Sequence, residues 1–105
     1  MASIDEIYVG TLSAATDLNK KAYADWRELY VGKQGLVCIF KSENIAKGKY
    51  FIKFYIVTDI KDIDDEADNL KTSPGDIYID EEKGIIRIKT MNSIYSFSNV
   101  HALKE

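Results

Sequence analysis

Residues 85–98 decide the fold class and read Ile-Ile-Arg-Ile-Lys-Thr-Met-Asn-Ser-Ile-Tyr-Ser-Phe-Ser. Two runs rich in β-branched and aromatic residues, Ile85 to Thr90 and Ile94 to Ser98, flank Met91-Asn92-Ser93. Such runs around a short polar connection are typical of a β-hairpin. Because side chains alternate along a strand, Arg87 and Lys89 should lie on the face opposite Ile86 and Ile88.

Upstream segments predict further strands of the same sheet. Tyr50 to Thr58 is the longest, and its apolar side chains on both faces indicate a central strand that is covered on both sides. A strong turn, Thr72-Ser73-Pro74-Gly75, separates it from the last part of the chain. The other strands are expected at residues 7–9, 36–41 and 76–80.

One segment has a helical pattern. Ala15, Leu18, Ala22, Trp26 and Leu29 are spaced three or four apart, which predicts a helix over residues 14–31 that ends at Gly32. We therefore expect an α+β fold. The helix would pack its Trp26 face on a curled antiparallel sheet of five or six strands, a small SH3-like barrel.

The composition indicates one domain, spanning residues 1–105, in a reducing compartment. The net charge of −3 disfavours duplex DNA as a partner, because a dedicated DNA binder usually carries a basic excess. Cys38 is the single cysteine and forms no internal disulfide, which favours the cytoplasm. The N-terminus has no signal-peptide pattern, and no apolar run is long enough to cross a membrane.

The sequence offers no set of catalytic residues, so we expect a protein that is not an enzyme and needs no cofactor. His101 is the only histidine, and Cys38 lies among apolar residues. The acidic run from Asp62 to Asp68 lacks the glycine and the glutamate of a calcium loop, because Ala67 and Ser73 stand at those positions. We expect a solvated loop there and no metal site.

Two groups of residues are candidates for binding. Tyr23, Arg27 and Tyr30 would share the outer face of the expected helix, and these residue types are frequent in the energetic centres of protein interfaces. Partial burial under a neighbouring loop would explain them equally well.

The second group carries a resemblance. Thr72-Ser73-Pro74, followed by Ile88-Lys89-Thr90-Met91-Asn92-Ser93-Ile94-Tyr95, is similar to a pattern in small phage- and prophage-encoded β-proteins, over residues 72–97. The resemblance implies origin and fold more than activity. Local stabilisation of the turn explains Thr90, Asn92 and Ser93 without a ligand. The alternative is a ligand pocket, for which the candidates are Thr72, Ser73, Arg87, Lys89, Thr90, Asn92, Ser93 and Tyr95.

Two functional hypotheses follow. The first is a phage-type protein in the cytoplasm of an infected or lysogenic bacterial cell, which inhibits a host protein, such as one in antiviral defence, through Tyr23, Arg27 and Tyr30. The alternative is a sponge for a cyclic or other signalling nucleotide, which would use Lys or Arg for phosphate and aromatic rings for the base. Because both faces of residues 50–57 are apolar, we also expect a homodimer.

Overall fold

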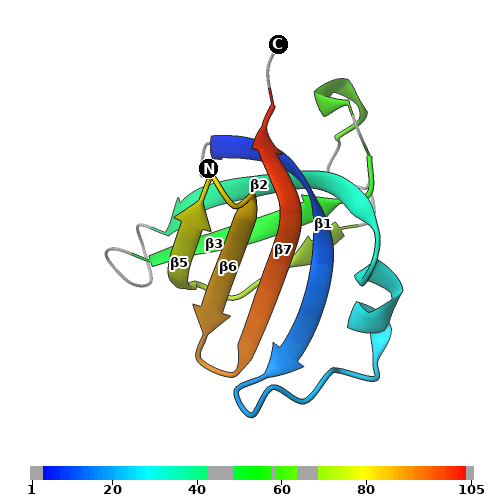
Figure 1. Ribbon diagram of the computed structural model, residues 1–105, viewed down its shortest axis with the longest axis vertical. Helices are drawn as coiled ribbons and strands as arrows, with labels where there is room; N and C mark the ends of the chain where they lie inside the picture. The colour runs from blue at the N-terminus through cyan, green and yellow to red at the C-terminus, as the bar shows by residue number, and fades with distance from the viewer. Residues whose placement is uncertain (1–3, 43–48, 58, 64–68, 104–105) are drawn as a thin grey trace.

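The chain forms a seven-stranded antiparallel sheet that closes on itself in a barrel-like arrangement (Figure 1). The computed structural model describes residues 4–42, 49–57, 59–63 and 69–103. The strands are β1 (Ile4–Asp17), β2 (Gln34–Ser42), β3 (Lys49–Tyr55), β4 (Asn69–Lys71), β5 (Gly75–Asp80), β6 (Ile85–Thr90) and β7 (Ser93–Ala102). Two short 3-10 helices, η1 (Trp26–Tyr30) and η2 (Ile60–Asp62), lie between strands.

The sheet closes because β2 pairs with β3 as well as with β1. The strand order is β2-β1-β7-β6-β5-β3-β4, and all pairings are antiparallel. β3 reaches β5 at a single pair, Tyr50 with Gly75, and β4 occupies the rest of that edge. A Cβ atom at Gly75 would lie 2.3 Å from the carbonyl oxygen of Lys89, so only glycine fits at this junction.

Side chains that point into the barrel form the main core. β3 contributes Ile52 and Phe54, and the Phe54 ring lies 5.3 Å from the Phe97 ring of β7. The alternating burial of β6 places Ile86 and Ile88 inside and Arg87 and Lys89 outside, as predicted. The buried members of the core are Tyr8, Leu12, Ala15, Val37, Ile39, Ile52, Phe54, Leu70, Ile86, Ile88, Tyr95, Phe97 and Val100.

A second hydrophobic cluster covers the outer face of β1, β2 and β3. Its buried members are Leu36, Cys38, Phe40 and Tyr55, and Phe51 stacks on Phe40 with 4.9 Å between the ring centres. Ile63 and Leu103 pack against this cluster from outside the three strands. The apolar outer face of β3 is therefore partly covered within one chain. The homodimer was expected because this face is apolar, and it stays a prediction.

The expected helix over residues 14–31 is wrong, and with it the α+β class. β1 continues to Asp17, and its last residues pair with β7. The pairing shifts register between Leu12 and Ala14, so that Leu12 and Ala15, three residues apart, are both buried. Of the series that resembles a helix, Ala15 lies in β1, Leu18 and Ala22 follow β1, and Trp26 and Leu29 lie in η1, so the spacing does not belong to one element. Leu18, Trp26 and Leu29 are exposed, so the proposed packing of Trp26 on the sheet is also wrong.

The strands expected at residues 7–9, 36–41, 50–58, 76–80, 85–90 and 94–98 correspond to β1, β2, β3, β5, β6 and β7. β4 was missed because three residues are too few for a periodic pattern.

Thr58 lies outside the described residues, as do four members of the acidic run, Asp64, Asp65, Glu66 and Asp68. Within the described part of the chain, no helix is long and apolar enough to cross a membrane.

We predict that Phe54→Ala lowers the free energy of unfolding by about 3–5 kcal/mol, because it leaves a cavity in the core. Trp26 is 51% exposed and touches Tyr30 through a ring edge, so Trp26→Ala should cost only about 1 kcal/mol. Urea denaturation of the two variants measures both values. A loss for Trp26→Ala that equals the loss for Phe54→Ala would contradict the exposed position of the indole.

Cys38 gives a prediction about pH. Burial raises the pKa of the Cys38 thiol to about 11, although the charge of Lys53 acts in the opposite direction. In the unfolded chain the thiol has a pKa of about 8.5. The native state therefore holds the proton more tightly, so this contribution to stability is complete below about pH 8.5 and is lost as the pH rises toward 11.

A thiol reagent at mildly alkaline pH should label Cys38 slowly in the native protein and rapidly in urea, because only the thiolate reacts. Rapid labelling of the native protein would show that Cys38 is accessible and would refute its place in the outer cluster.

Candidate functional site

A pocket at one end of the barrel brings together three segments that are distant in sequence. They are the segment between β1 and β2, which contains η1, the connection between β4 and β5, and the turn between β6 and β7. The pocket has a volume of about 160 Å³. We call it the Arg27 pocket, and its lining residues are Tyr23, Trp26, Arg27, Lys71, Ser73, Thr90, Met91, Asn92, Ser93 and Tyr95.

Hydrogen bonds hold the first segment, residues 18–33, against the end of β1. The Asp17 carboxylate accepts from the backbone N–H groups of Asn19 and Lys21 at 2.8 and 3.0 Å, which shapes a tight turn. The backbone N–H of Tyr23 donates to the carbonyl of Ala15 at 3.0 Å. At the other end of the segment, Gly32 donates to Leu12 at 2.7 Å and Leu12 donates to Lys33 at 3.1 Å. The segment is therefore fixed at both ends, although it contains no α-helix.

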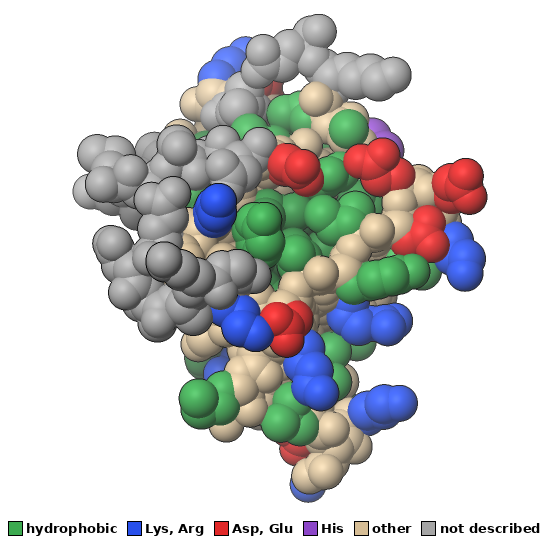
Figure 2. Space-filling model, turned by 90° about the vertical axis from the view of Figure 1, so that its left-hand side faces the viewer, with side chains coloured by type: hydrophobic (Ala, Val, Ile, Leu, Met, Phe, Trp, Pro, Cys, Tyr) green, Lys and Arg blue, Asp and Glu red, His purple; other side chains and the backbone are tan. Residues whose placement is uncertain are grey.

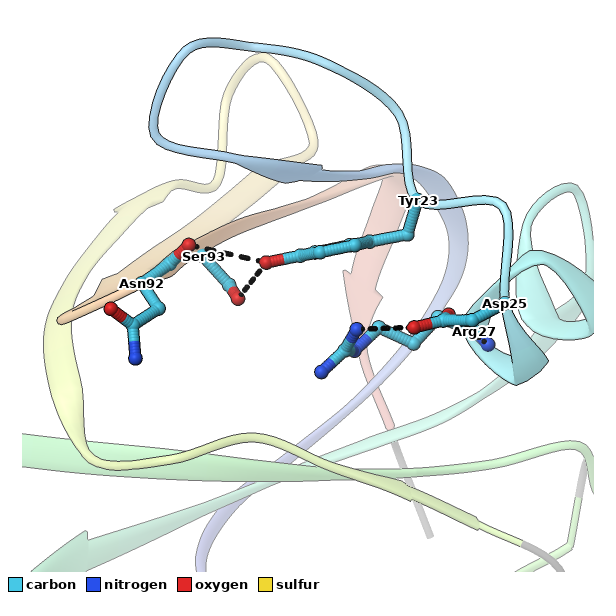
Figure 3. Close-up of polar contacts among 5 residues, drawn as sticks. All are labelled: Tyr23, Asp25, Arg27, Asn92 and Ser93. Carbon is cyan, nitrogen blue, oxygen red and sulfur yellow. Dashed lines mark hydrogen bonds and ion pairs between the residues drawn. The ribbon is translucent and has the colours of Figure 1, made fainter.

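Tyr23 connects this segment to the β6–β7 turn. Its hydroxyl lies 3.1 Å from the Asn92 carbonyl and 2.6 Å from the Ser93 hydroxyl (Figure 3). The turn has its own brace, because the Thr90 hydroxyl accepts from the Ser93 N–H at 3.1 Å and donates to the Ser93 carbonyl at 3.3 Å. Thr90 and Ser93 are buried, so their hydroxyls serve first to shape the turn.

Arg27 crosses the pocket below the Tyr23 ring. Its guanidinium carbon lies 4.0 Å from the centre of that ring and 5.4 Å from the centre of the Trp26 ring. One terminal nitrogen, Nη1, donates to the Asp25 carboxylate at 2.7 Å. The other terminal nitrogen is directed away from Asp25, toward Asn92 (Figure 3). Nε is buried and has no hydrogen-bond partner among the described residues.

The electrostatics of the pocket depend mainly on Arg27. Among the described residues, no Asp or Glu lines the pocket. Lys71 is the second cation of the wall, and its ammonium nitrogen lies 5.3 Å from the centre of the Phe51 ring. Asp25 pairs with Arg27 from outside the lining, and its side chain is 43% exposed. The pocket is therefore a small cationic site with aromatic, hydroxyl and amide groups around it.

The structure brings together residues that the sequence assigned to two different binding sites. Tyr23 and Arg27, expected to bind a protein, lie in one pocket with Ser73, Thr90, Asn92, Ser93 and Tyr95, expected to bind a small ligand. The two hypotheses therefore compete for the same residues, and mutation of the two groups separately would not discriminate between them.

The remaining candidates lie outside the Arg27 pocket. Tyr30 packs against the core, with its ring 6.5 Å from Phe54. Thr72 is buried, and its hydroxyl accepts from the Ile52 N–H at 3.0 Å, which extends the pairing of β4 with β3. Arg87 is exposed on the outer face of β6 and lies 3.4 Å from the Ser96 hydroxyl. Lys89 borders a wider neighbouring cleft.

Sequence reasoning missed Trp26, Lys71 and Met91. Trp26 was assigned to the core because of its helical spacing, and Lys71 lies in the short strand that was not predicted. Met91 is 84% exposed at the tip of the predicted hairpin. Its place in the turn could be predicted from the sequence, but its proximity to Arg27 could not. No group of three or more His, Cys, Asp or Glu side chains suited to a metal occurs in the described part of the chain.

We predict that Tyr23→Phe lowers the free energy of unfolding by about 1 kcal/mol, because it removes the hydrogen bonds of a partly buried hydroxyl. Amide exchange should also become faster at residues 22–27, where the tie to the β6–β7 turn is lost. Tyr78→Phe is the matched control, since the Tyr78 hydroxyl is exposed and bonds only its neighbour Asp80 at 3.3 Å. Equal behaviour of the two variants would show that the Tyr23 contact does not hold the segment.

Comparison with known proteins identifies no relative. No protein-family model, curated protein or solved structure matches the chain. The functional argument therefore rests on the geometry of the Arg27 pocket and of the surfaces around it.

Proposed function

We propose that the protein binds a nucleotide in the Arg27 pocket and acts by sequestering it, without catalysis. The observation that carries this proposal is the position of Arg27, which is stacked under Tyr23 and directs one end of its guanidinium into a pocket without acidic lining residues. A nucleotide combines an anionic phosphate, polar sugar hydroxyls and a flat aromatic base. Each of these has a suitable group in or beside the pocket.

The phosphate would bind to Arg27. Arginine presents planar N–H donors that match phosphate oxygens, and the Tyr23 ring holds this plane in place. Asp25 uses only Nη1, which leaves donors on the other side of the guanidinium. Nε is buried without a partner among the described residues, which is costly unless a bound group or a small shift of the side chain satisfies it.

The base would stack on Trp26 at the rim. Tyr23 is already covered by Arg27 on one face, whereas the Trp26 ring is 51% exposed. Stacking of a base on an aromatic ring contributes about 1–3 kcal/mol. The side-chain amide of Asn92 has no described partner and offers both a donor and an acceptor to the sugar or the base.

The size of the pocket limits what enters it. A volume of about 160 Å³ is less than the roughly 300–1,000 Å³ of sites that enclose a whole drug-sized ligand. Phosphate and sugar would occupy it, and the base would remain on the surface. A neighbouring cleft of about 680 Å³ shares Ser73, Thr90, Met91 and Asn92 with the pocket, and it has room for the rest of a larger ligand such as a dinucleotide.

A second candidate function is inhibition of a host protein. Trp26, Leu29 and Val31 are exposed by 51, 72 and 38% on the segment beside the pocket, and grouped exposed apolar side chains favour a protein partner. We rank it second, because apolar exposure does not account for the stacking of Arg27 under Tyr23 or for its position in a cationic pocket. Both candidates place the protein in the cytoplasm of a bacterial cell that carries a phage, as the resemblance of residues 72–97 implies.

We predict that Arg27→Ala weakens nucleotide binding by about 10–100-fold, which corresponds to about 1.5–3 kcal/mol for a hydrogen-bonded charged group. Isothermal titration with adenosine and guanosine monophosphates, their cyclic forms and cyclic dinucleotides provides the measurement. Arg87→Ala is the matched control, because it removes an exposed arginine outside the pocket and should leave affinity unchanged.

Leu29→Ser discriminates between the two candidates. Leu29 is 72% exposed and does not line the pocket, so this variant should bind nucleotide normally and should lose a protein partner that contacts the apolar patch. Absence of binding to every nucleotide of the panel at millimolar concentration, or unchanged affinity in Arg27→Ala, would refute the nucleotide proposal.

A further inference from the structure

Among the described residues, one edge of β5 has little strand pairing. β5 pairs with β6 over six residue pairs, from Gly75–Thr90 to Asp80–Ile85. On its other side, the described residues of β3 pair with it at Tyr50–Gly75 alone. In the described part of the chain, no strand pairs with this other edge from Asp76 to Asp80. Such an edge presents backbone N–H and C=O groups that can pair with another chain.

A hydrophobic groove lies beside this open edge. It has a volume of about 330 Å³ and is lined by Glu6, Ile39, Lys41, Tyr50, Ile77 and Ile79. Ile77, Ile79 and Tyr50 pack against the main core but remain partly exposed, so the core reaches the surface here. Figure 2 faces this side of the molecule and shows hydrophobic side chains gathered at its centre, with acidic side chains along one border.

The acidic border has a definite structure. The Tyr8 hydroxyl lies 2.6 Å from the Glu6 carboxylate and 3.2 Å from the Glu81 carboxylate. A single O–H can donate to only one of them at a time, so two carboxylates are held together with one donor between them. Glu82 follows Glu81 in the exposed β5–β6 turn and adds a further negative charge. Among the described groove-lining residues Lys41 is the one cation, and Lys49 at the start of β3 pairs with Asp76 of the edge.

We propose that the β5 edge binds an extended segment of another protein, which adds a strand to the sheet and has alternating apolar and basic side chains. Backbone hydrogen bonds to residues 76–80 would supply pairing, and the apolar side chains would fill the groove over Ile77 and Ile79. Because side chains alternate along a strand, the basic side chains would lie on the outer face, beside Asp76 and Asp80, with the exposed Glu82 in the turn that follows β5. This surface shares no lining residue with the Arg27 pocket, so the inference is independent of nucleotide binding.

A second copy of this chain fits the edge poorly. The antiparallel pairing of two β5 edges that overlaps residues 76–80 completely is centred on Tyr78. It places Asp76 of one chain opposite Asp80 of the other, twice. Like charges directly opposite each other in a sheet are destabilising. Charge therefore favours a different, basic segment over self-association at this edge.

The test uses a short synthetic peptide of alternating lysine and valine, titrated into the full-length protein and followed by amide NMR and hydrogen exchange. We expect saturable binding, shifts at residues 76–80, and exchange of these amides that slows by about tenfold or more in the complex. A peptide of alternating glutamate and valine should bind at least about tenfold more weakly. A lysine–valine peptide that is N-methylated at every second residue keeps its charge but loses donors, and it should also bind at least about tenfold more weakly.

Variants of the acidic border complete the test. The double variant Glu81→Gln with Glu82→Gln should weaken binding of the lysine–valine peptide by about threefold or more, whereas Glu28→Gln, which changes an exposed carboxylate on η1, should not. No binding of the lysine–valine peptide, or equal binding of its N-methylated form, would overturn the proposal. A dimer in the absence of peptide with protected amides at residues 76–80 would also overturn it, since it would assign the edge to a second copy.

Discussion

β1 pairs with β2 on one side and with β7 on the other, and the rest of the structure depends on this double pairing. A strand of 14 residues can serve both neighbours in a small barrel only if it bends. Its register shifts after Ile4, after Val9 and after Leu12, and such bulges increase bending and twist. The bent strand allows β2 to reach β3, so the sheet closes around Phe54 and Phe97.

The same strand positions the Arg27 pocket. Beyond Asp17 the chain leaves the sheet, and it returns to β2 at Gln34. Between these points, backbone hydrogen bonds to Ala15 and Leu12 hold it against the outgoing strand. The tie from Tyr23 to Asn92 and Ser93 then fixes its distance from the β6–β7 turn. Arg27 is confined between the Tyr23 ring and Asp25, so its direction follows from the way the barrel closes.

The regular strands of this architecture could be predicted from the sequence, whereas the irregular segment after β1 could not. The β6–β7 hairpin was predictable, because residues 85–98 carry two β-rich runs around a polar turn, and Arg87 and Lys89 lie outside as the alternation of side chains requires. The segment from Ala15 to Leu29 was not, because its spacing of three and four runs across the end of β1, the connection after it and η1 rather than along one helix. Only contacts along β7 show that residues 14–17 are extended.

The candidate site was predictable in its parts and not as a whole. Tyr23, Arg27, Asn92 and Ser93 were each selected from the sequence for sound chemical reasons, yet they were assigned to two different kinds of partner. Their meeting depends on a contact between residues 70 positions apart, for which local pattern gives no signal. Trp26 was predicted to lie in the core because of the same spacing that predicted the helix.

The central claim is that Arg27 holds the phosphate of a nucleotide, and NMR of the arginine side chain tests it most directly. The Nε–Hε resonance of Arg27 should shift and sharpen when a nucleotide that binds is added, together with the Trp26 indole and the Asn92 side-chain amide, while Arg87 stays unchanged. Inorganic phosphate alone should move Arg27 without Trp26. A nucleotide complex in which Arg27 does not respond, or in which Arg87 responds instead, would contradict the account.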